Sequence, residues 1–175
     1  MKKRLLIQFL AIFFLLGCTS KKKIVQSKFY EENINVNLYA FVGEKISVER
    51  FDPNKNNTKK IKDPNSTDSI IIKEYVMDYG FNSTYKILQN VYNSFETDTI
   101  VFKAYDHYGN PAFKNEKYVL LYVSKSANEG YYHVKYQFDS LKKTKFGFKG
   151  YNGKSIERLF TDKKNTVLKE RKLFD

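Results

Sequence analysis

Apolar and polar residues alternate over much of the chain beyond residue 33, with the period of two that is typical of β-strands. In the segment 34–42, Val36, Leu38 and Ala40 fall on one face and polar Asn37 falls on the other. The residues between such segments are rich in Gly, Asn, Asp and Pro, which favour turns. The pattern predicts strands at 34–42, 45–51, 84–92, 99–105, 118–124 and 131–138.

Other segments have weaker patterns. Gly43 and Glu44 are expected to form a turn between the first two strands, and 52–68, which carries two prolines, to form a long polar loop. Segment 69–77 contains three consecutive isoleucines and is predicted as a strand, although its ends would also suit a helix. The C-terminal part is expected to contain a short edge strand at 146–149, one or two helical turns at 155–160, and a strand or a charged amphipathic segment at 166–174.

Short strands at near-regular spacing, with one small helix, are typical of antiparallel β-architectures. The run 118–123 is apolar or aromatic at every position, as expected for a central strand that is covered on both faces. We therefore predict a mainly β fold, namely an antiparallel β-sandwich or barrel-like domain with one short helix near the C-terminus.

The pattern at residues 1–17 differs from that of the rest of the chain. Lys2, Lys3 and Arg4 form a basic start, and the apolar run 5–16 that follows is interrupted only by Gln8. A helix needs about 20 apolar residues to cross a bilayer, so this run is too short to span one. Its layout is that of a secretory signal.

The signal ends at Leu15, Leu16, Gly17 and Cys18, and Cys18 is the only cysteine in the chain. These four residues resemble the lipobox of bacterial lipoproteins, although Leu16 is bulkier than the Ala or Ser usual at its position. The resemblance implies cleavage between Gly17 and Cys18. It also implies a diacylglycerol thioether on the Cys18 sulfur and an acyl chain on the new amino group.

The same resemblance bears on location. In many Gram-negative bacteria an Asp after the lipidated cysteine retains a lipoprotein in the inner membrane, but here Thr19 follows. In Bacteroidetes-type lipoproteins, the signal for export to the cell surface resembles an acidic cluster close behind the cysteine. Here the corresponding residues, Lys21, Lys22 and Lys23, are basic. We therefore expect a lipid anchor in the cell envelope, in the outer membrane facing the periplasm, with a Gram-positive membrane anchor as the alternative.

These features divide the chain into a signal peptide at 1–17, a lipidated cysteine with a flexible tether at 18–33, and a single β-rich domain at 34–175. The whole chain has a net charge of +12 at pH 7, and loss of the three cations of the signal peptide leaves +9. Such a charge favours anionic partners. We expect a membrane contact through the lipid on Cys18, an envelope protein or another anionic partner, and no nucleic acid.

Candidate metal sites are weak. His107 and His133 are the only histidines, which is too few for a zinc site without other ligands. Asp52, Asn54 and Asn56 have the spacing of a calcium loop, but its glycine and its bidentate glutamate are missing. We predict no metal and no cofactor.

The sequence signals for a catalytic site are equally weak. Lipidation of Cys18 removes the only thiol, which excludes disulfides and thiol catalysis. The sequence has no nucleophile elbow, phosphate-binding glycine loop or zinc-protease motif, and its carboxylates are scattered. We therefore predict that the protein is not an enzyme.

Three hydroxyl side chains are candidates for modification. Ser69, Thr99 and Ser140 each follow an aspartate and precede isoleucine or leucine. These triplets resemble the O-glycosylation signal of secreted Bacteroidetes proteins, which implies that the three residues are acceptors. The same triplets suit the starts of strands, because Asp-Ser and Asp-Thr favour turn ends.

Aromatic side chains are the best binding candidates on the predicted sheet. Tyr39 and Phe41 share one strand, and Tyr131, Tyr132 and Tyr136 share another. Their rings could form a binding face for peptide or glycan, or they could pack into an ordinary core, which is the more common arrangement.

Residues 34–175 resemble small uncharacterised lipoproteins of Bacteroidetes in general character only. We predict a noncatalytic β-domain that binds a protein or an envelope ligand through its sheet or through the 52–68 loop. One alternative is an immunity or inhibitor lipoprotein that acts against a periplasmic toxin. The other is an envelope hydrolase or a glycan-binding domain.

Overall fold

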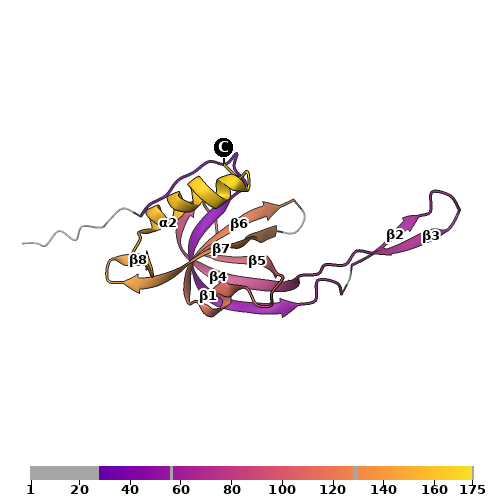
Figure 1. Ribbon diagram of the computed structural model, residues 1–175, viewed down its shortest axis with the longest axis horizontal. Helices are drawn as coiled ribbons and strands as arrows, with labels where there is room; N and C mark the ends of the chain where they lie inside the picture. The colour runs from indigo at the N-terminus through magenta and orange to yellow at the C-terminus, as the bar shows by residue number, and fades with distance from the viewer. Residues whose placement is uncertain (1–27, 56, 128–129, 175) are drawn as a thin grey trace, which may run out of the picture.

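The computed structural model describes residues 28–55, 57–127 and 130–174. Its main sheet has six strands in the order β5–β4–β1–β6–β7–β8 (Figure 1). The strands are β1 (Tyr39–Phe51), β4 (Tyr79–Tyr92), β5 (Thr99–Asp106), β6 (Tyr118–Ser126), β7 (Gly130–Thr144) and β8 (Gly147–Gly150). The prediction of a mainly β, antiparallel fold is confirmed.

A short parallel pairing closes five of these strands into a barrel. Phe102 and Lys103 of β5 lie beside Tyr131 and Tyr132 of β7, so the ring runs β1–β4–β5–β7–β6 and back to β1. A five-stranded Greek-key barrel of this kind is the architecture of OB-folds. The chain therefore has the barrel-like form of the predicted fold.

The barrel encloses one of two hydrophobic clusters. Its buried members come from β1, β4, β5 and β6, and include Phe41, Tyr85 and Phe102. A short 3₁₀ helix, η1 (Ala112–Asn115), adds Phe113, whose ring lies 6.0 Å from that of Phe102. Burial of these aromatic rings stabilises the closed form of the sheet.

The second cluster lies between the sheet and the C-terminal helix α2 (Ile156–Lys163) (Figure 1). Ser155 caps the helix by accepting a hydrogen bond from the Arg158 amide, as its residue type favours. The helix predicted at 155–160 is confirmed. It continues into a π-helical turn, η2 (Lys164–Leu168), so the segment predicted from 166 begins as a helix rather than as a strand.

Strand β6 separates the two clusters. Leu120 and Tyr122 belong to the helix-covered cluster, and Leu121 and Val123 belong to the barrel interior. Because successive side chains of a strand point to opposite faces, a strand buried on both sides must be apolar throughout. The prediction of a strand covered on both faces is confirmed.

The turn predicted at Gly43 and Glu44 is wrong, because both residues lie inside the long strand β1. The register with β4 shifts between Val42 and Gly43, which marks a β-bulge. A Cβ atom at Gly43 would lie 2.9 Å from the Phe41 ring and 3.0 Å from the Tyr85 ring. Glycine therefore allows two core rings to approach the backbone where the strand bends.

Gly80 provides a second close approach, and replacing it with alanine is expected to destabilise the domain by about 2 kcal/mol. The added Cβ would lie 2.6 Å from the Phe51 ring, which packs edge to face against Tyr105 at 6.1 Å. Chemical denaturation measures the change, and Phe51→Ala supplies the control. In the double variant the cost of the Gly80 substitution should largely disappear; an unchanged cost would show that the clash is not its cause.

The N-terminal part of the described chain packs against the domain. The Phe29 ring lies 5.9 Å from that of Phe160, and Glu31 pairs with Lys164 at 2.5 Å and forms a β-bridge with Tyr92. The packed unit therefore begins before residue 34, earlier than the sequence suggested. The first strand begins later, at Tyr39 rather than at residue 34, because the chain first makes a turn.

The predicted signal peptide (1–17) and the predicted lipidation site, Cys18, lie outside the described residues. Within the described ranges, no helix is both long enough and apolar enough to cross a bilayer.

Candidate functional site

The segment between β1 and β4 leaves the barrel as a two-stranded arm. Strands β2 (Thr58–Lys62) and β3 (Ser69–Lys73) pair antiparallel and extend well beyond the barrel (Figure 1). Every residue of both strands is exposed. The prediction of a loop over 52–68 is therefore wrong for β2, whereas the strand predicted at 69–77 is confirmed over the range of β3.

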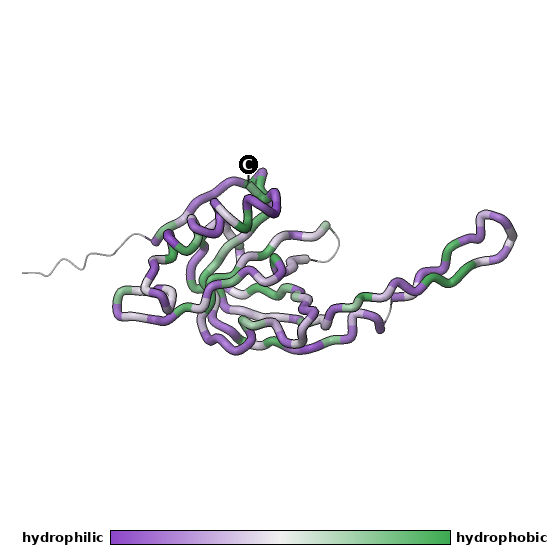
Figure 2. Tube along the Cα trace, in the orientation of Figure 1, coloured by the Kyte–Doolittle hydropathy of each residue, from purple (hydrophilic) through white to green (hydrophobic). Residues whose placement is uncertain are grey.

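One face of the arm is apolar. Residues paired directly across an antiparallel ladder point to the same side. Because Ile61 pairs with Ile70 and Lys59 pairs with Ile72, three isoleucines share one face, with exposures of 41%, 42% and 39%. Figure 2 shows this hydrophobic stretch on the arm, away from both clusters. Exposed apolar side chains grouped in this way mark interaction sites.

The opposite face of the arm is basic. It carries Ile71, which is 69% exposed, among Lys60, Lys62 and Lys73. Lys59 on the apolar face is neutralised by Glu74 at 3.0 Å, but no carboxylate of the described residues pairs with Lys60 or Lys62. The arm therefore offers an apolar surface on one side and uncompensated positive charge on the other.

Asn54 fixes the two chains of the arm to each other near the barrel. Its side-chain amide donates to the Val76 carbonyl at 2.9 Å and accepts from the Val76 amide at 2.8 Å. The carboxylate of Asp52 accepts from the Asn54 backbone amide at 2.8 Å. Asn54 thus performs a structural task at the position where the sequence offered a calcium ligand, and Asn56 lies outside the described residues.

Asp78 ties the root of the arm to the barrel. Its carboxylate accepts from Lys135 at 2.5 Å and contacts His107 Nδ1 at 3.1 Å. The Lys135 hydrogen bond is the main reason that the pKa of Asp78 lies below its ordinary value. Lys135 can reach this point because β7 bulges here, with Tyr136 in a left-handed conformation (φ 67°). The arm is therefore held at its base by two polar clamps.

His133 stands on the buried side of the same bulge. Its Nε2 lies 2.8 Å from the Gln137 carbonyl, and its ring packs on Phe113 at 4.8 Å. Burial lowers the pKa of His133 to about 4, so the imidazole is neutral at pH 7. The two histidines thus have separate partners, and the part of the chain that the structure describes contains no group of three or more metal-ligating side chains.

The aromatic residues considered for binding fall into two groups. Phe41 is fully buried in the barrel interior, whereas Tyr39 and Tyr131, whose rings pack edge to face at 5.3 Å, are partly buried against it. Tyr132 and Tyr136 are exposed at 41% and 45%. Of these five rings, Tyr132 and Tyr136 therefore offer the most surface to a partner.

The three hydroxyl candidates for glycosylation lie in different places. Ser69 and Thr99 are exposed first residues of β3 and β5. Ser140 lies within β7, opposite Val119 of β6, and is partly buried. Ser69 and Thr99 therefore fit both interpretations of the triplets, as strand starts and as accessible hydroxyls, while Ser140 fits neither as well.

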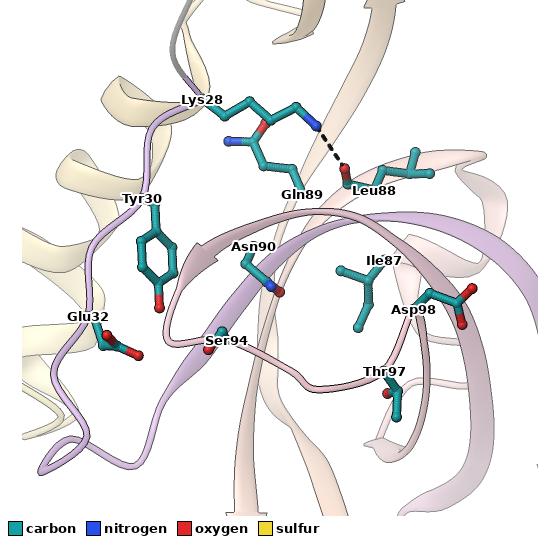
Figure 3. A pocket seen from close by; sticks show the side chains of 10 residues that line it. All are labelled: Lys28, Tyr30, Glu32, Ile87, Leu88, Gln89, Asn90, Ser94, Thr97 and Asp98. Atoms are coloured by element: carbon teal, nitrogen blue, oxygen red, sulfur yellow. Dashed lines mark hydrogen bonds between the residues drawn. The ribbon is translucent and has the colours of Figure 1, made fainter.

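A shallow hollow of about 660 Å³ lies between the N-terminal segment and β4 (Figure 3). Lys28, Tyr30 and Glu32 form one wall, and Lys28 donates a hydrogen bond to the Leu88 carbonyl at 3.3 Å. The charged residues of the hollow, including Asp98, are exposed. Acid–base catalysis depends on desolvated, perturbed groups, so this hollow is a poor catalytic candidate.

A second hollow of about 530 Å³ lies at the root of the arm. It runs from Arg50, whose guanidinium lies 4.0 Å above the Tyr79 ring, to the exposed side chains of Tyr75 and Met77. The apolar surface of the arm therefore continues towards the barrel.

No protein-family model, curated protein or solved structure matches the chain. The function must be inferred from the geometry of the chain itself. Of the surfaces described above, the arm combines the greatest exposure with the most distinct chemistry.

Strand β2 and its pairing with β3 were missed at the level of sequence, although a local signal for the arm exists. Two short runs, 58–62 and 69–73, flank a turn-forming stretch at 63–68 that contains proline, asparagine and serine. This is the pattern of a hairpin with a longer loop. Three lysines among the five residues of 58–62 hid the strand, because they mask the alternation of apolar residues.

Proposed function

We propose that this chain is a lipid-anchored lipoprotein of the cell envelope whose noncatalytic β-barrel presents the β2–β3 arm to a protein partner. The observation that carries the proposal is the isoleucine face of the arm, which is exposed and distant from either hydrophobic cluster. A two-stranded ribbon alone is marginally stable in water. A partner that covers this face would supply the missing burial.

The position of the arm also favours a partner beyond the anchoring membrane. The described chain starts on the side of the barrel opposite to the arm (Figure 1). Ten residues run from Cys18 to residue 27, and they can span at most roughly 35 Å. A lipid on Cys18 would thus hold the barrel close to the membrane and leave the arm directed away from it.

The fold is compatible with binding through this segment. In OB-fold barrels the loop between the first two barrel strands is among the elements that bind ligands. The arm occupies that connection, between β1 and β4. This support is an analogy of architecture alone, because barrels of one type serve many functions.

Labelling in the native host tests the anchor. We expect a clickable palmitate to label the chain and the label to be lost in Cys18→Ser. An unlabelled wild-type chain in the soluble fraction would contradict the anchor.

Site-specific photo-crosslinking tests the arm. A crosslinker at position 71 should give a discrete product in intact cells. The same crosslinker at position 146, where Phe146 is 73% exposed on another part of the domain, should not. Equal products from both positions, or none from position 71, would contradict a specific role of the arm.

A further inference from the structure

We infer that the free edge of β3 is a docking edge for an extended strand of the partner, and that this strand alternates acidic and apolar residues. The inference rests on the proposed function, because it names the chemistry of the partner that the arm binds.

Among the residues that the structure describes, β3 pairs only with β2, so the backbone of β3 has unpaired groups along its outer edge. The Asp63 amide donates to the Asp68 carbonyl at 3.0 Å, which marks a hydrogen-bonded pair beside the tip. Bonded and non-bonded pairs alternate along an antiparallel ladder. Ser69, Ile71 and Lys73 therefore turn their N–H and C=O groups outwards.

The two edges of the arm are not equally protected. Lysines on an edge strand discourage the addition of another strand, and β2 has them at three of its five positions. In β3, by contrast, three consecutive isoleucines precede the only charged residue, Lys73. β-Branched residues favour strand pairing. This asymmetry assigns the docking edge to β3.

The two faces of the arm specify the incoming strand. Side chains of an added strand alternate between the faces of the sheet that it joins. Those on the face of Ile61, Ile70 and Ile72 would extend an apolar surface. Those on the other face would lie near Lys60, Lys62 and Lys73, which carboxylates would neutralise. Backbone hydrogen bonds would supply affinity, and the alternation would supply specificity.

Two other occupants fit less well. A second copy paired through β3 would place two sets of lysines on one face, without added carboxylates to compensate them. A membrane would meet Asp63 and Asp68 at the tip of the arm. The arm also points away from the start of the described chain.

A peptide titration tests the inference. The protein is the mature chain, residues 18–175, with Cys18→Ser. The probe is a short peptide of alternating glutamate and valine with one tryptophan. Because the chain contains no tryptophan, selective excitation of the peptide tryptophan reports binding without a tryptophan background from the protein. We expect saturable binding, which should be lost when lysine replaces glutamate in the peptide.

Two matched pairs separate edge pairing from charge attraction. Ile71→Pro removes an outward N–H and should weaken binding by about tenfold, the effect of one lost hydrogen bond. Ile71→Thr keeps that N–H and should bind like the wild type. In the docked peptide, the backbone N–H groups of every second residue point towards β3. N-methylation of these residues should abolish binding to the unmodified protein, whereas N-methylation of the residues between them, whose N–H groups point away, should not. The comparison of the two methylated peptides remains valid even if the proline substitution distorts the arm, because it uses the unmodified protein.

Equal binding of both methylated peptides would overturn the inference and leave only charge attraction. A dimer of the free protein that Ile71→Pro dissociates would identify a second copy as the occupant. Binding to anionic vesicles without binding to the peptide would identify a membrane. None of these results affects palmitate labelling or crosslinking from position 71, so the proposed function stands or falls separately.

Discussion

Replacing Phe160 with alanine is expected to destabilise the domain by about 4 kcal/mol. The ring is fully buried between α2 and the sheet, and it stacks on Tyr92 at 5.3 Å and on Tyr122 at 6.4 Å. It also contacts Phe29, so its loss should loosen the N-terminal segment together with the helix. The cavity would be large because aromatic rings that are fixed by other contacts cannot collapse into it.

Chemical denaturation followed by circular dichroism measures this loss. Glu157→Ala is the control, because Glu157 lies on the exposed side of the same helix and should change stability by less than about 0.5 kcal/mol. A change of under 1 kcal/mol in Phe160→Ala would mean that α2 is an accessory rather than a part of the core.

Acidification should destabilise the domain through His133 by about 3 kcal/mol between pH 6.5 and pH 4. The His133 imidazole has its ordinary pKa in the unfolded chain, and burial lowers that pKa to about 4 in the folded chain. Within this interval the unfolded state binds the additional proton, so the stabilisation is complete above about pH 6.5 and declines as the pH falls to 4. Below that value both states are protonated and this effect ends.

The control for this prediction is His133→Gln, which keeps a side-chain nitrogen near the Gln137 carbonyl but cannot titrate. Unfolding free energies measured from pH 7 to pH 4 should fall more steeply for the wild type than for this variant. Asp139, whose pKa is raised by burial, titrates in both proteins and cancels in the comparison. Parallel pH profiles would show that His133 is accessible to solvent in the folded state.

Most strands could be predicted from the sequence because burial of one strand face produces the alternation of apolar and polar residues. In β6, Leu120 and Leu121 point to different clusters, and the uninterrupted apolar run follows directly from that arrangement. The signal for the helix at 155–160 also lies in the local sequence, since Ser155 is a typical N-cap residue.

Features that depend on distant partners could not be predicted in this way. Gly43 is as good a residue for a turn as for a bulge, and the rings of Phe41 and Tyr85 that require it become neighbours only in the barrel. Closure of the barrel depends on two pairs of residues in β5 and β7 that are almost thirty positions apart. Such pairing leaves no local pattern.

The candidate site was predicted in outline only. The 52–68 loop was proposed as a contact element, and the arm begins there, but its second strand and both of its faces depend on the pairing of Ile61 with Ile70. The aromatic face was ambiguous because Tyr131 and Tyr132 are adjacent in the sequence, yet Tyr131 packs against the barrel cluster and Tyr132 faces solvent. A bulge changes which face of the sheet the following side chains point to, so the buried positions of such a strand cannot be assigned by counting every second residue from one end.

The two hydrophobic clusters share strand β1, which contributes Phe41 to the interior of the barrel and Ala40 and Val42 to the layer under α2. The layer under α2 cannot be completed while Phe160 and Leu168, near the C-terminal end, are missing. We therefore expect a chain that still lacks these residues to leave the apolar side chains of that layer exposed, on the same strand that supports the barrel interior.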